Sequence, residues 1–204
     1  MSQKSTPRIM RGLPEDLRTV AAELYLEAFG QKLGPILGRD DRAAAFLAHI
    51  LRPSHAIVAL GDDGQLLGLA GFHDAETGLV GGSFADLSAV YGFVGAAWRA
   101  MALSIFERTP KPGEFLMDGI AVAAEARGAG VGTALLAAVL DAARADGASY
   151  VRLDVIDSNP RARALYERTG FKALKEERTG FLTRPFGFTS STTMIYSLKP
   201  AKDA

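Results

Sequence analysis

The sequence predicts a mixed α/β fold in which helices cover a mixed β-sheet, with a helical insertion between the third and fourth strands. Three observations predict it. Strand-like and helical patterns alternate in the second half of the chain, a hairpin-like pair of apolar runs stands in the first half, and residues 74–113 interrupt both with a helical pattern. Of the 204 residues, 48% are hydrophobic, so a single domain over residues 1–204 can bury a substantial core.

The first half of the chain is expected to contribute a short strand over residues 7–11, then two helices and a hairpin. Residues 15–29 carry apolar side chains at helical spacing, and a second helix over 40–51 is ended by a nearby proline. Residues 54–60 and 65–72 are apolar runs that flank a Gly-Asp-Asp-Gly turn, which is typical of an antiparallel hairpin.

The 74–113 segment is expected to hold one long helix or two short ones over residues 84–108. Apolar residues recur there in steps of three and four, which places them on one helical face, used for the core or for contact with a second copy. Glycines and charged residues interrupt the segment, so it lacks the roughly 20 uninterrupted apolar residues of a membrane-spanning helix. The face consists of Leu87, Tyr91, Val94, Trp98, Met101 and Ile105.

Regular alternation returns in the second half. A strand over residues 114–122 is followed by a helix over 132–146, which an Asp-Gly dipeptide ends, and then by a strand over 149–156 and a helix over 160–169. This order favours a mixed sheet covered by helices. The last two strands are expected over residues 171–177 and 192–198.

The composition argues against several classes of function. Lys plus Arg and Asp plus Glu number 23 each, so no net positive charge favours nucleic-acid binding. The absence of cysteine excludes disulfides and thiolate chemistry and fits a cytoplasmic location, as does a polar start without a secretory signal. The histidines His49, His55 and His73 lack metal-ligand spacing, so we expect surface or hydrogen-bonded roles and no metal.

A Gly-rich turn before the helix at 132–146 is the most informative segment. Residues 127–132 read Arg-Gly-Ala-Gly-Val-Gly, and glycines before a helix start can seat phosphate oxygens on backbone N–H groups. A Walker loop would need a lysine where Gly132 stands, and a dinucleotide fingerprint starting at Gly128 would need glycine in place of Thr133. A purely structural turn is the alternative.

A second motif follows at residues 159–171, which read Asn-Pro-Arg-Ala-Arg-Ala-Leu-Tyr-Glu-Arg-Thr-Gly-Phe. With the loop, it resembles the GNAT family of N-acetyltransferases, in which an (Gln/Arg)-x-x-Gly-x-(Gly/Ala) loop is followed by Asn-x-x-Ala-x-x-Leu-Tyr-x-x-x-Gly-Phe. The match is strong over residues 114–171, architectural before residue 74 and absent across 74–113. The resemblance implies a GNAT-like acyl-CoA N-acyltransferase fold with residues 114–171 as its acetyl-CoA-binding core.

The resemblance also implies where acetyl-CoA binds. Its pyrophosphate would lie on the amides of the Gly-rich loop, and its pantetheine arm would insert like an extra strand where the strands at 114–122 and 149–156 diverge. The cofactor-binding residues implied in this way are Ile120, Ala121, Val122, Arg127, Gly128, Ala129, Gly130, Val131, Gly132, Thr133, Asn159 and Tyr166.

Two residues are candidates for catalysis. The resemblance implies that Tyr166 protonates the departing CoA thiolate, a role that suits a phenol, although packing on the sheet is the alternative. Period-two alternation puts Asp118 on the same strand face as Leu116, Ile120 and Val122. A carboxylate among apolar neighbours can serve as a general base or bind an amine; a strand-end carboxylate bonding a nearby loop is the alternative.

The expected function is direct transfer of an acetyl group from acetyl-CoA to a primary amine, without a metal, nucleic acid or membrane. Asn159 either contacts the pantetheine arm or caps the helix that begins at Pro160. One alternative keeps the fold as a catalytically silent CoA-binding module, and another is a nucleotide-binding regulator. The acceptor, the acyl chain length, the role of residues 74–113 and a homodimer are left open.

Overall fold

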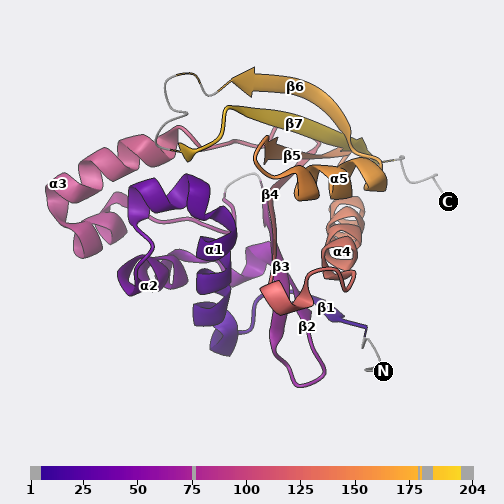
Figure 1. Cartoon of the computed structure of the whole chain (residues 1–204), viewed down its shortest axis with the longest axis horizontal. Helices are drawn as coiled ribbons and strands as arrows, with labels where there is room; N and C mark the ends of the chain where they lie inside the picture. The colour runs from indigo at the N-terminus through magenta and orange to yellow at the C-terminus, as the bar shows by residue number, and fades with distance from the viewer. Residues whose placement is uncertain (1–5, 75–76, 179, 181–185, 199–204) are drawn as a thin grey trace.

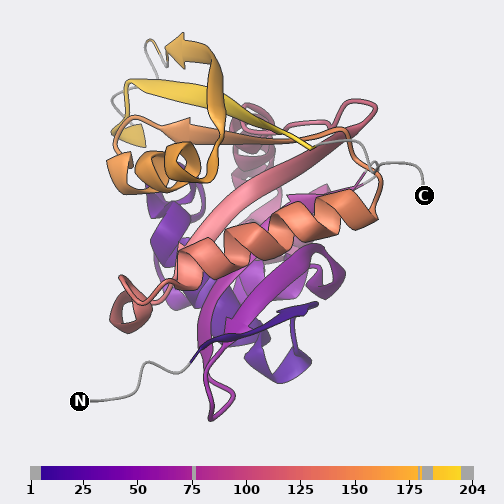
Figure 2. The same ribbon diagram turned by 90° about the vertical axis from the view of Figure 1, so that its right-hand side faces the viewer.

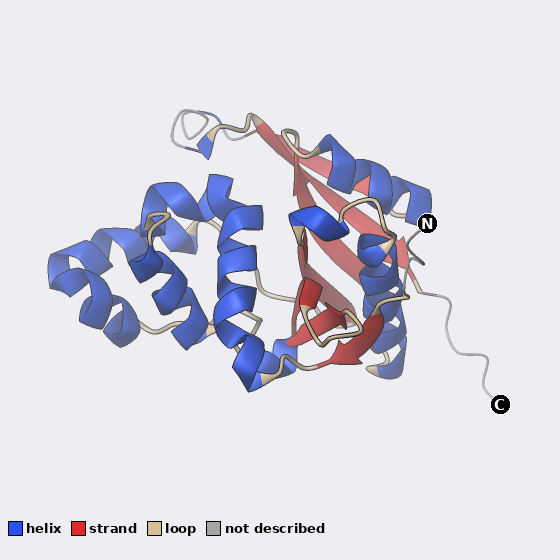
Figure 3. Cartoon of the chain, turned by 60° about the horizontal axis from the view of Figure 1, so that its bottom comes forward, coloured by secondary structure: helices blue, strands red, loops and turns tan. Residues whose placement is uncertain are grey.

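The computed structural model of the chain shows a β-sheet with helices packed against both of its faces (Figures 1 and 3). It describes residues 6–74, 77–178, 180 and 186–198. Most of the loop that joins the last two strands therefore lies outside the described residues.

The described strands form one seven-stranded mixed sheet. They are β1 (Arg8–Arg11), β2 (Ala56–Leu60), β3 (Leu66–His73), β4 (Glu114–Val122), β5 (Tyr150–Ile156), β6 (Lys172–Arg178) and β7 (Ser190–Ser197). Their order across the sheet is β1-β2-β3-β4-β5-β7-β6. The strands β4 and β5 pair in parallel, whereas the other neighbours pair antiparallel. This architecture confirms the predicted fold class.

The helices divide between the two faces of the sheet. They are α1 (Arg18–Leu37), α2 (Asp41–Ile50), α3 (Phe84–Ser104), α4 (Val131–Ala145) and α5 (Pro160–Thr169). The first three lie on one face, with α3 farthest from the sheet, and the last two on the other (Figures 1 and 3). Figure 2 shows α4 running across its face, where it packs against β2, β3 and β4.

The bounds of α5 follow from local signals in the sequence. Asn159 caps its start, because the side-chain oxygen accepts a hydrogen bond from the N–H of Ala162 at 3.1 Å. Pro160 occupies the first helical position, where its missing N–H costs nothing. Gly170 ends the helix in the left-handed region, with φ of 108°.

The helix α1 is longer than predicted. A short 3₁₀ turn at Glu15–Leu17 precedes it, and the helix then continues through Pro35 to Leu37 instead of ending near residue 29. Ile36 and Leu37 are each 2% exposed, so their burial holds the last turn against the core. Tertiary packing of this kind outweighs the helix-breaking tendency of the local sequence.

The helix α3 does not present the single apolar face that its spacing predicts. Gly92 has φ of 69° and ψ of 167° and kinks the helix, so the residues after it turn away from the face that precedes it. Leu87 is 5% exposed, whereas Val94 and Met101 are 80% and 71% exposed. The prediction failed because a glycine in the left-handed region changes the direction of the helix, which breaks the periodicity.

Among the described residues, no helix combines the length and the apolar character that crossing a bilayer requires.

Candidate functional site

The strands β4 and β5 pair along only part of their length. Their paired residues are Glu114 with Tyr150, Phe115 with Val151 and Leu116 with Arg152. Beyond the last pair, β4 continues to Val122 and β5 to Ile156 without pairing to one another. The interior of the sheet therefore contains backbone groups that a bound extended ligand can reach.

A cavity of about 760 Å³ lies at this divergence. Its lining comes from β4, the Gly-rich turn, α5, the end of β5 and the middle of α1. Of the residues expected to bind the cofactor, Ala129 alone is absent from the lining. The residues of that set that the cavity brings together are Ile120, Ala121, Val122, Arg127, Gly128, Gly130, Val131, Gly132, Thr133, Asn159 and Tyr166.

The Gly-rich turn leads directly into α4. Gly128 and Gly130 have φ of 81° and 87°, and a Cβ at either position would meet no atom within 4 Å. Gly130 is the N-cap residue and supplies no side-chain acceptor to the first turn of α4. The free N–H groups at the start of a helix, with its partial positive charge, form a seat for an anion such as a phosphate.

Arg127 already has two partners at the edge of the cavity. Its Nε donates to the carbonyl oxygen of Val122 at 3.1 Å, and its Nη2 donates to Oε1 of Glu27 at 2.8 Å. The Arg127 and Glu27 side chains are 41% and 58% exposed, so the ion pair is open to solvent. A phosphate approaching Arg127 would compete with the Glu27 carboxylate.

Tyr166 and Asn159 face the same cavity from α5. Tyr166 is 4% exposed, and burial raises the pKa of its phenol well above the ordinary value. Its hydroxyl has no hydrogen-bond partner among the described residues. Because the pKa is raised, the phenol is neutral at pH 7 and holds a proton that it can donate, as a weaker acid than a solvent-exposed tyrosine. The side-chain oxygen of Asn159 is used by the helix cap, which leaves the Nδ2 group for a ligand.

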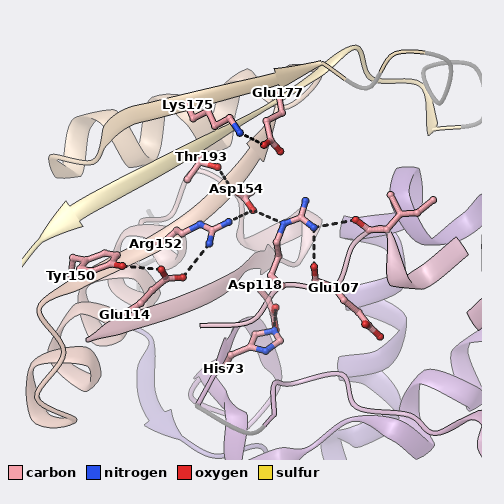
Figure 4. Close-up of polar contacts among 12 residues, drawn as sticks. His73, Glu107, Glu114, Asp118, Tyr150, Arg152, Asp154, Lys175, Glu177 and Thr193 are labelled. Carbon is pink, nitrogen blue, oxygen red and sulfur yellow. Dashed lines mark hydrogen bonds and ion pairs between the residues drawn. The ribbon is translucent and has the colours of Figure 1, made fainter. Parts of the chain in front are cut away.

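Asp118 lies two residues past the last β4–β5 pair and carries an unexpected partner. Its Oδ1 is 2.6 Å from Nε2 of His73, at the end of β3 (Figure 4). The two side chains are 18% and 20% exposed. The other carboxylate oxygen, Oδ2, is buried and has no hydrogen-bond partner in the described structure. The pair therefore holds a carboxylate that is only half satisfied.

The strand is irregular at Asp118. The β3–β4 register shifts there, because Gly71 pairs with Gly119 while Phe72 pairs with Met117. The strict alternation predicted for β4 is therefore interrupted at this residue, as a β-bulge does by inserting an unpaired residue. Bulges of this kind re-aim a side chain, which here brings Asp118 to His73.

The neighbouring charges act on the His73 ring. Burial by itself lowers the pKa of His73, but the hydrogen bond and charge of Asp118, with the charge of Asp74, raise it above the ordinary value overall. The ring also packs closely on Gly78, where a Cβ would lie 2.3 Å from it. The imidazole is thus held both electrostatically and sterically beside the carboxylate.

A second cavity, of about 640 Å³, lies on the face of the sheet that α1, α2 and α3 cover. It is lined by parts of α1, α2, α3 and the segments on either side of α3. Four residues line both cavities: Phe29, Lys32, Asp118 and Asp154. The two cavities therefore meet at Asp118, whose partner His73 lines the second cavity only.

Lys32 stands at this junction on α1. Burial lowers the pKa of Lys32, an effect that Asp154 and Asp118 oppose and Arg108 reinforces. Asp154 is itself held by several groups. It accepts from the Thr193 hydroxyl at 2.5 Å and lies 3.4 Å from Nε of Arg108.

An ion-pair network joins β4 and β5 where their pairing ends (Figure 4). Arg152 contacts Glu114 at 3.3 Å and Asp154 at 3.5 Å, and the Tyr150 hydroxyl donates to Glu114 at 3.0 Å. The Glu114 side chain is 1% exposed. Buried charges need such partners, so the network fixes the closed end of the divergence.

Sequence reasoning missed several residues of this junction. The hydrogen bond of His73 agrees with the expected surface or hydrogen-bonded role, but its partner Asp118 was not predicted, and neither Lys32 nor Asp154 was considered. The only signal in the sequence was the position of His73 at the end of a strand.

Among the described residues there is no group of three or more side chains arranged to hold a metal.

Comparisons with known proteins agree with this fold. Residues 18–171 match the model of a family described as the acetyltransferase (GNAT) family. An N-acetyltransferase from Staphylococcus aureus Mu50 is 16% identical, with 93% of this chain and 100% of that chain covered at a TM-score of 0.66. A GCN5-related N-acetyltransferase from Kribbella flavida is 17% identical, with 94% of this chain and 98% of that chain covered at a TM-score of 0.62.

A protein from Salmonella typhimurium, whose structure contains its cofactor acetyl-CoA, is 16% identical, with 98% of each chain covered at a TM-score of 0.55. At these identities the likeness concerns the fold. No curated protein matched the chain.

Proposed function

The chain belongs to the GNAT family of acetyltransferases and is an acetyl-CoA-dependent N-acyltransferase; from this premise we propose that it transfers the acetyl group to a primary amine by direct attack. The observation that carries the proposal is the junction of two cavities at Asp118. The first cavity is lined by the phosphate seat, and the second extends from Asp118 to residues of α2 and α3. Two substrates can therefore reach one carboxylate from two cavities.

The first cavity fits acetyl-CoA on its own features. The pyrophosphate would accept hydrogen bonds from the uncapped start of α4, close to Gly130 and Gly132. The absence of Cβ atoms on these glycines leaves room for a close approach. The pantetheine arm would bond the free edge of β4 at 120–122, and Asn159 would contribute its Nδ2 group.

The proposed base is Asp118, with His73 as its partner. An alkylamine is mostly protonated at neutral pH, because its pKa is near ~10.4 for a lysine-like group. The amine must lose a proton before it attacks the thioester carbonyl. Asp118 would orient the ammonium and accept its proton, directly or through the His73 ring 2.6 Å away.

The remaining steps use the backbone and Tyr166. A backbone amide near Val122 would stabilise the negative oxygen that develops on the carbonyl. As the C–S bond breaks, Tyr166 would donate its proton to the thiolate, so that the products are an N-acetylated amine and free CoA. Tyr166 lines the first cavity together with Asn159, Ala162 and Leu165.

The extent of the domain and its assembly are also proposals. We propose that residues 1–204 form one domain. The exposed apolar residues that follow the kink in α3, Val94 and Met101 among them, support a homodimer contact. Sedimentation of the protein and of a Met101→Lys variant tests it.

The experiment that tests the proposed function has two stages. The first measures the thermal midpoint with acetyl-CoA, ATP or NAD, and we expect a rise with acetyl-CoA alone. A ligand that binds only the folded state adds about 2.7 kcal/mol of stability at 100 times its dissociation constant. The second measures thiol release when amines are added.

The variant Asp118→Asn separates the proposed base from a structural role. We expect it to lower kcat about 10²- to 10⁴-fold while acetyl-CoA binding is retained. The matched control is Asp141→Asn, which removes a carboxylate whose side chain is 76% exposed on α4. Wild-type turnover in Asp118→Asn would show that Asp118 is not the base, and an absence of acetyl-CoA binding would refute the whole proposal.

A further inference from the structure

We infer that the acceptor is a primary amine carried on a bulky apolar body, such as an arylalkylamine or a long alkylamine. This inference rests on the proposed function and adds the class of acceptor. It comes from the second cavity, whose two ends have different chemistry.

Part of the wall of the second cavity is apolar. Leu33 of α1, Val80 before α3, and Leu103, Ile105 and Phe106 at the end of α3 all line it. None of these five side chains is fully buried, so apolar surface is left at the cavity instead of being sealed in the core. An acceptor that covers this surface removes it from water. The free energy of binding then becomes more favourable in proportion to the apolar area of the acceptor that is buried.

The end of the cavity at Asp118 can take one ammonium group. The carboxylates of Asp118 and Asp154 lie there, and the buried Oδ2 of Asp118 lacks a hydrogen-bond partner in the described structure. Asp154 already contacts Arg108 and Arg152. Oδ1 of Asp118 already contacts His73, and Lys32 lines the same end of the cavity, so the capacity that is left for an ammonium group is the Oδ2 atom of Asp118.

Further charged side chains line the second cavity. They are Arg108, which contacts Asp154, together with Arg178, Glu107 and Glu177, and Glu177 is paired with Lys175 at 2.6 Å. The two arginines disfavour additional ammonium groups on the acceptor.

The volume of the cavity agrees with an acceptor larger than a simple methylamine. About 640 Å³ lies within the range of sites that bury drug-sized ligands. A small polar amine would leave the apolar wall in contact with water and gain little from it.

The test is a series of amines of similar basicity, assayed with the purified full-length chain by release of CoA thiol. Ethylamine, butylamine, hexylamine and 2-phenylethylamine vary the apolar body, while ethanolamine and spermidine supply polar and polycationic alternatives. We expect kcat/KM to rise with chain length, by up to about fourfold for each methylene removed from water.

The variants Leu33→Ser and Leu103→Ser should flatten this rise and leave acetyl-CoA binding unchanged, because both residues line the second cavity and neither lines the first. The matched control is Leu174→Ser, a leucine on β6 that is 65% exposed and lines neither cavity. A binding readout accompanies the kinetics. Hexylamine should raise the thermal midpoint of the CoA-bound protein more than ethylamine does.

The outcomes separate the two proposals. A flat dependence on chain length, or faster turnover with ethanolamine or spermidine than with hexylamine, overturns the inference and leaves the proposed function standing. Acetyl-CoA binding without thiol release for any amine overturns both. A flattened rise in Leu174→Ser would show that the variants act through the fold as a whole.

Discussion

His73 and Asp118, 45 residues apart in the sequence, are joined by a 2.6 Å contact between Nε2 and Oδ1 at the junction of two cavities. The contact links the end of β3 to the irregular point of β4, so the position of the imidazole depends on the bulge as well as on the carboxylate. It makes the protonation of His73 a direct probe of the proposed site.

Replacing the carboxylate should lower the pKa of His73. Asp118→Asn removes the hydrogen-bonded negative charge that raises it, while the burial that lowers it remains. The measurement is an NMR titration of the ring protons, which is tractable because the chain has 3 histidines. A pKa that stays the same in Asp118→Asn would mean that the pair does not exist in solution.

The same pair should make stability depend on pH. Because the pKa of His73 is higher in the folded protein than in the unfolded chain, folding retains a proton that the unfolded chain releases near pH 6.5. The stabilisation is complete below that pH and is lost as the pH rises through the folded pKa. We therefore expect His73→Gln to lower the thermal midpoint more at pH 5.5 than at pH 8.5. An equal loss at both pH values would contradict this reading.

Alanine variants of two left-handed glycines should distinguish a loss of stability caused by backbone strain from a loss of acetyl-CoA affinity. Gly130→Ala and Gly147→Ala each place a Cβ where no atom lies within 4 Å, at φ of 87° and 73°. Each should destabilise the protein by about 1–2 kcal/mol, because L-residues disfavour this conformation. Only Gly130 lines the first cavity, so acetyl-CoA affinity should fall in Gly130→Ala alone. Calorimetric titration of both variants measures it, and equal losses of affinity would count against the phosphate seat.

The competition at Arg127 should appear as opposite effects of two variants. Arg127→Ala should weaken acetyl-CoA binding, whereas Glu27→Gln should strengthen it, because the guanidinium is released from a carboxylate 2.8 Å away. Both changes should alter stability by no more than about 1 kcal/mol, since the pair is exposed. Titrations at low and high salt check the charge dependence. If Glu27→Gln weakens binding as much as Arg127→Ala, the ion pair is structural.

Removing the Tyr166 hydroxyl should affect chemistry and not folding. Tyr166→Phe keeps the buried ring, and the hydroxyl has no partner in the described part of the chain, so the free energy of unfolding should change by less than about 1 kcal/mol. If the phenol is the proton donor, kcat should fall at least about 100-fold while the KM for acetyl-CoA changes little. A kcat within twofold of wild type would assign Tyr166 to packing.

Where local chemistry determines an element, the sequence was sufficient to predict it. The strand β4 at Glu114–Val122 and the helix α5 at Pro160–Thr169 have the predicted bounds. In α5, Asn159 and Gly170 provide the cap and the left-handed end that define those bounds.

Where distant parts of the chain determine the outcome, the sequence was not sufficient. The last turn of α1 is held by the burial of Ile36 and Leu37, which depends on residues far along the chain. The pairing of His73 with Asp118 depends on a register shift between β3 and β4 that no local pattern announces. The Gly-rich turn that leads into α4 could be predicted because it is built from consecutive residues, whereas the junction of the cavities could not.

The parallel pairing of β4 with β5 ends after three residue pairs, so the sheet consists of two blocks joined by a short seam beside the Glu114–Arg152 ion pair. Blocks connected so sparsely can open separately, with different protection of their amides from hydrogen exchange. A ligand that forms hydrogen bonds to both β4 and β5 where they diverge would link the two blocks. Amide exchange should then slow throughout β5 and β7, including strand positions remote from the ligand, so that binding of acetyl-CoA also stiffens the block of the sheet that lies beyond β4.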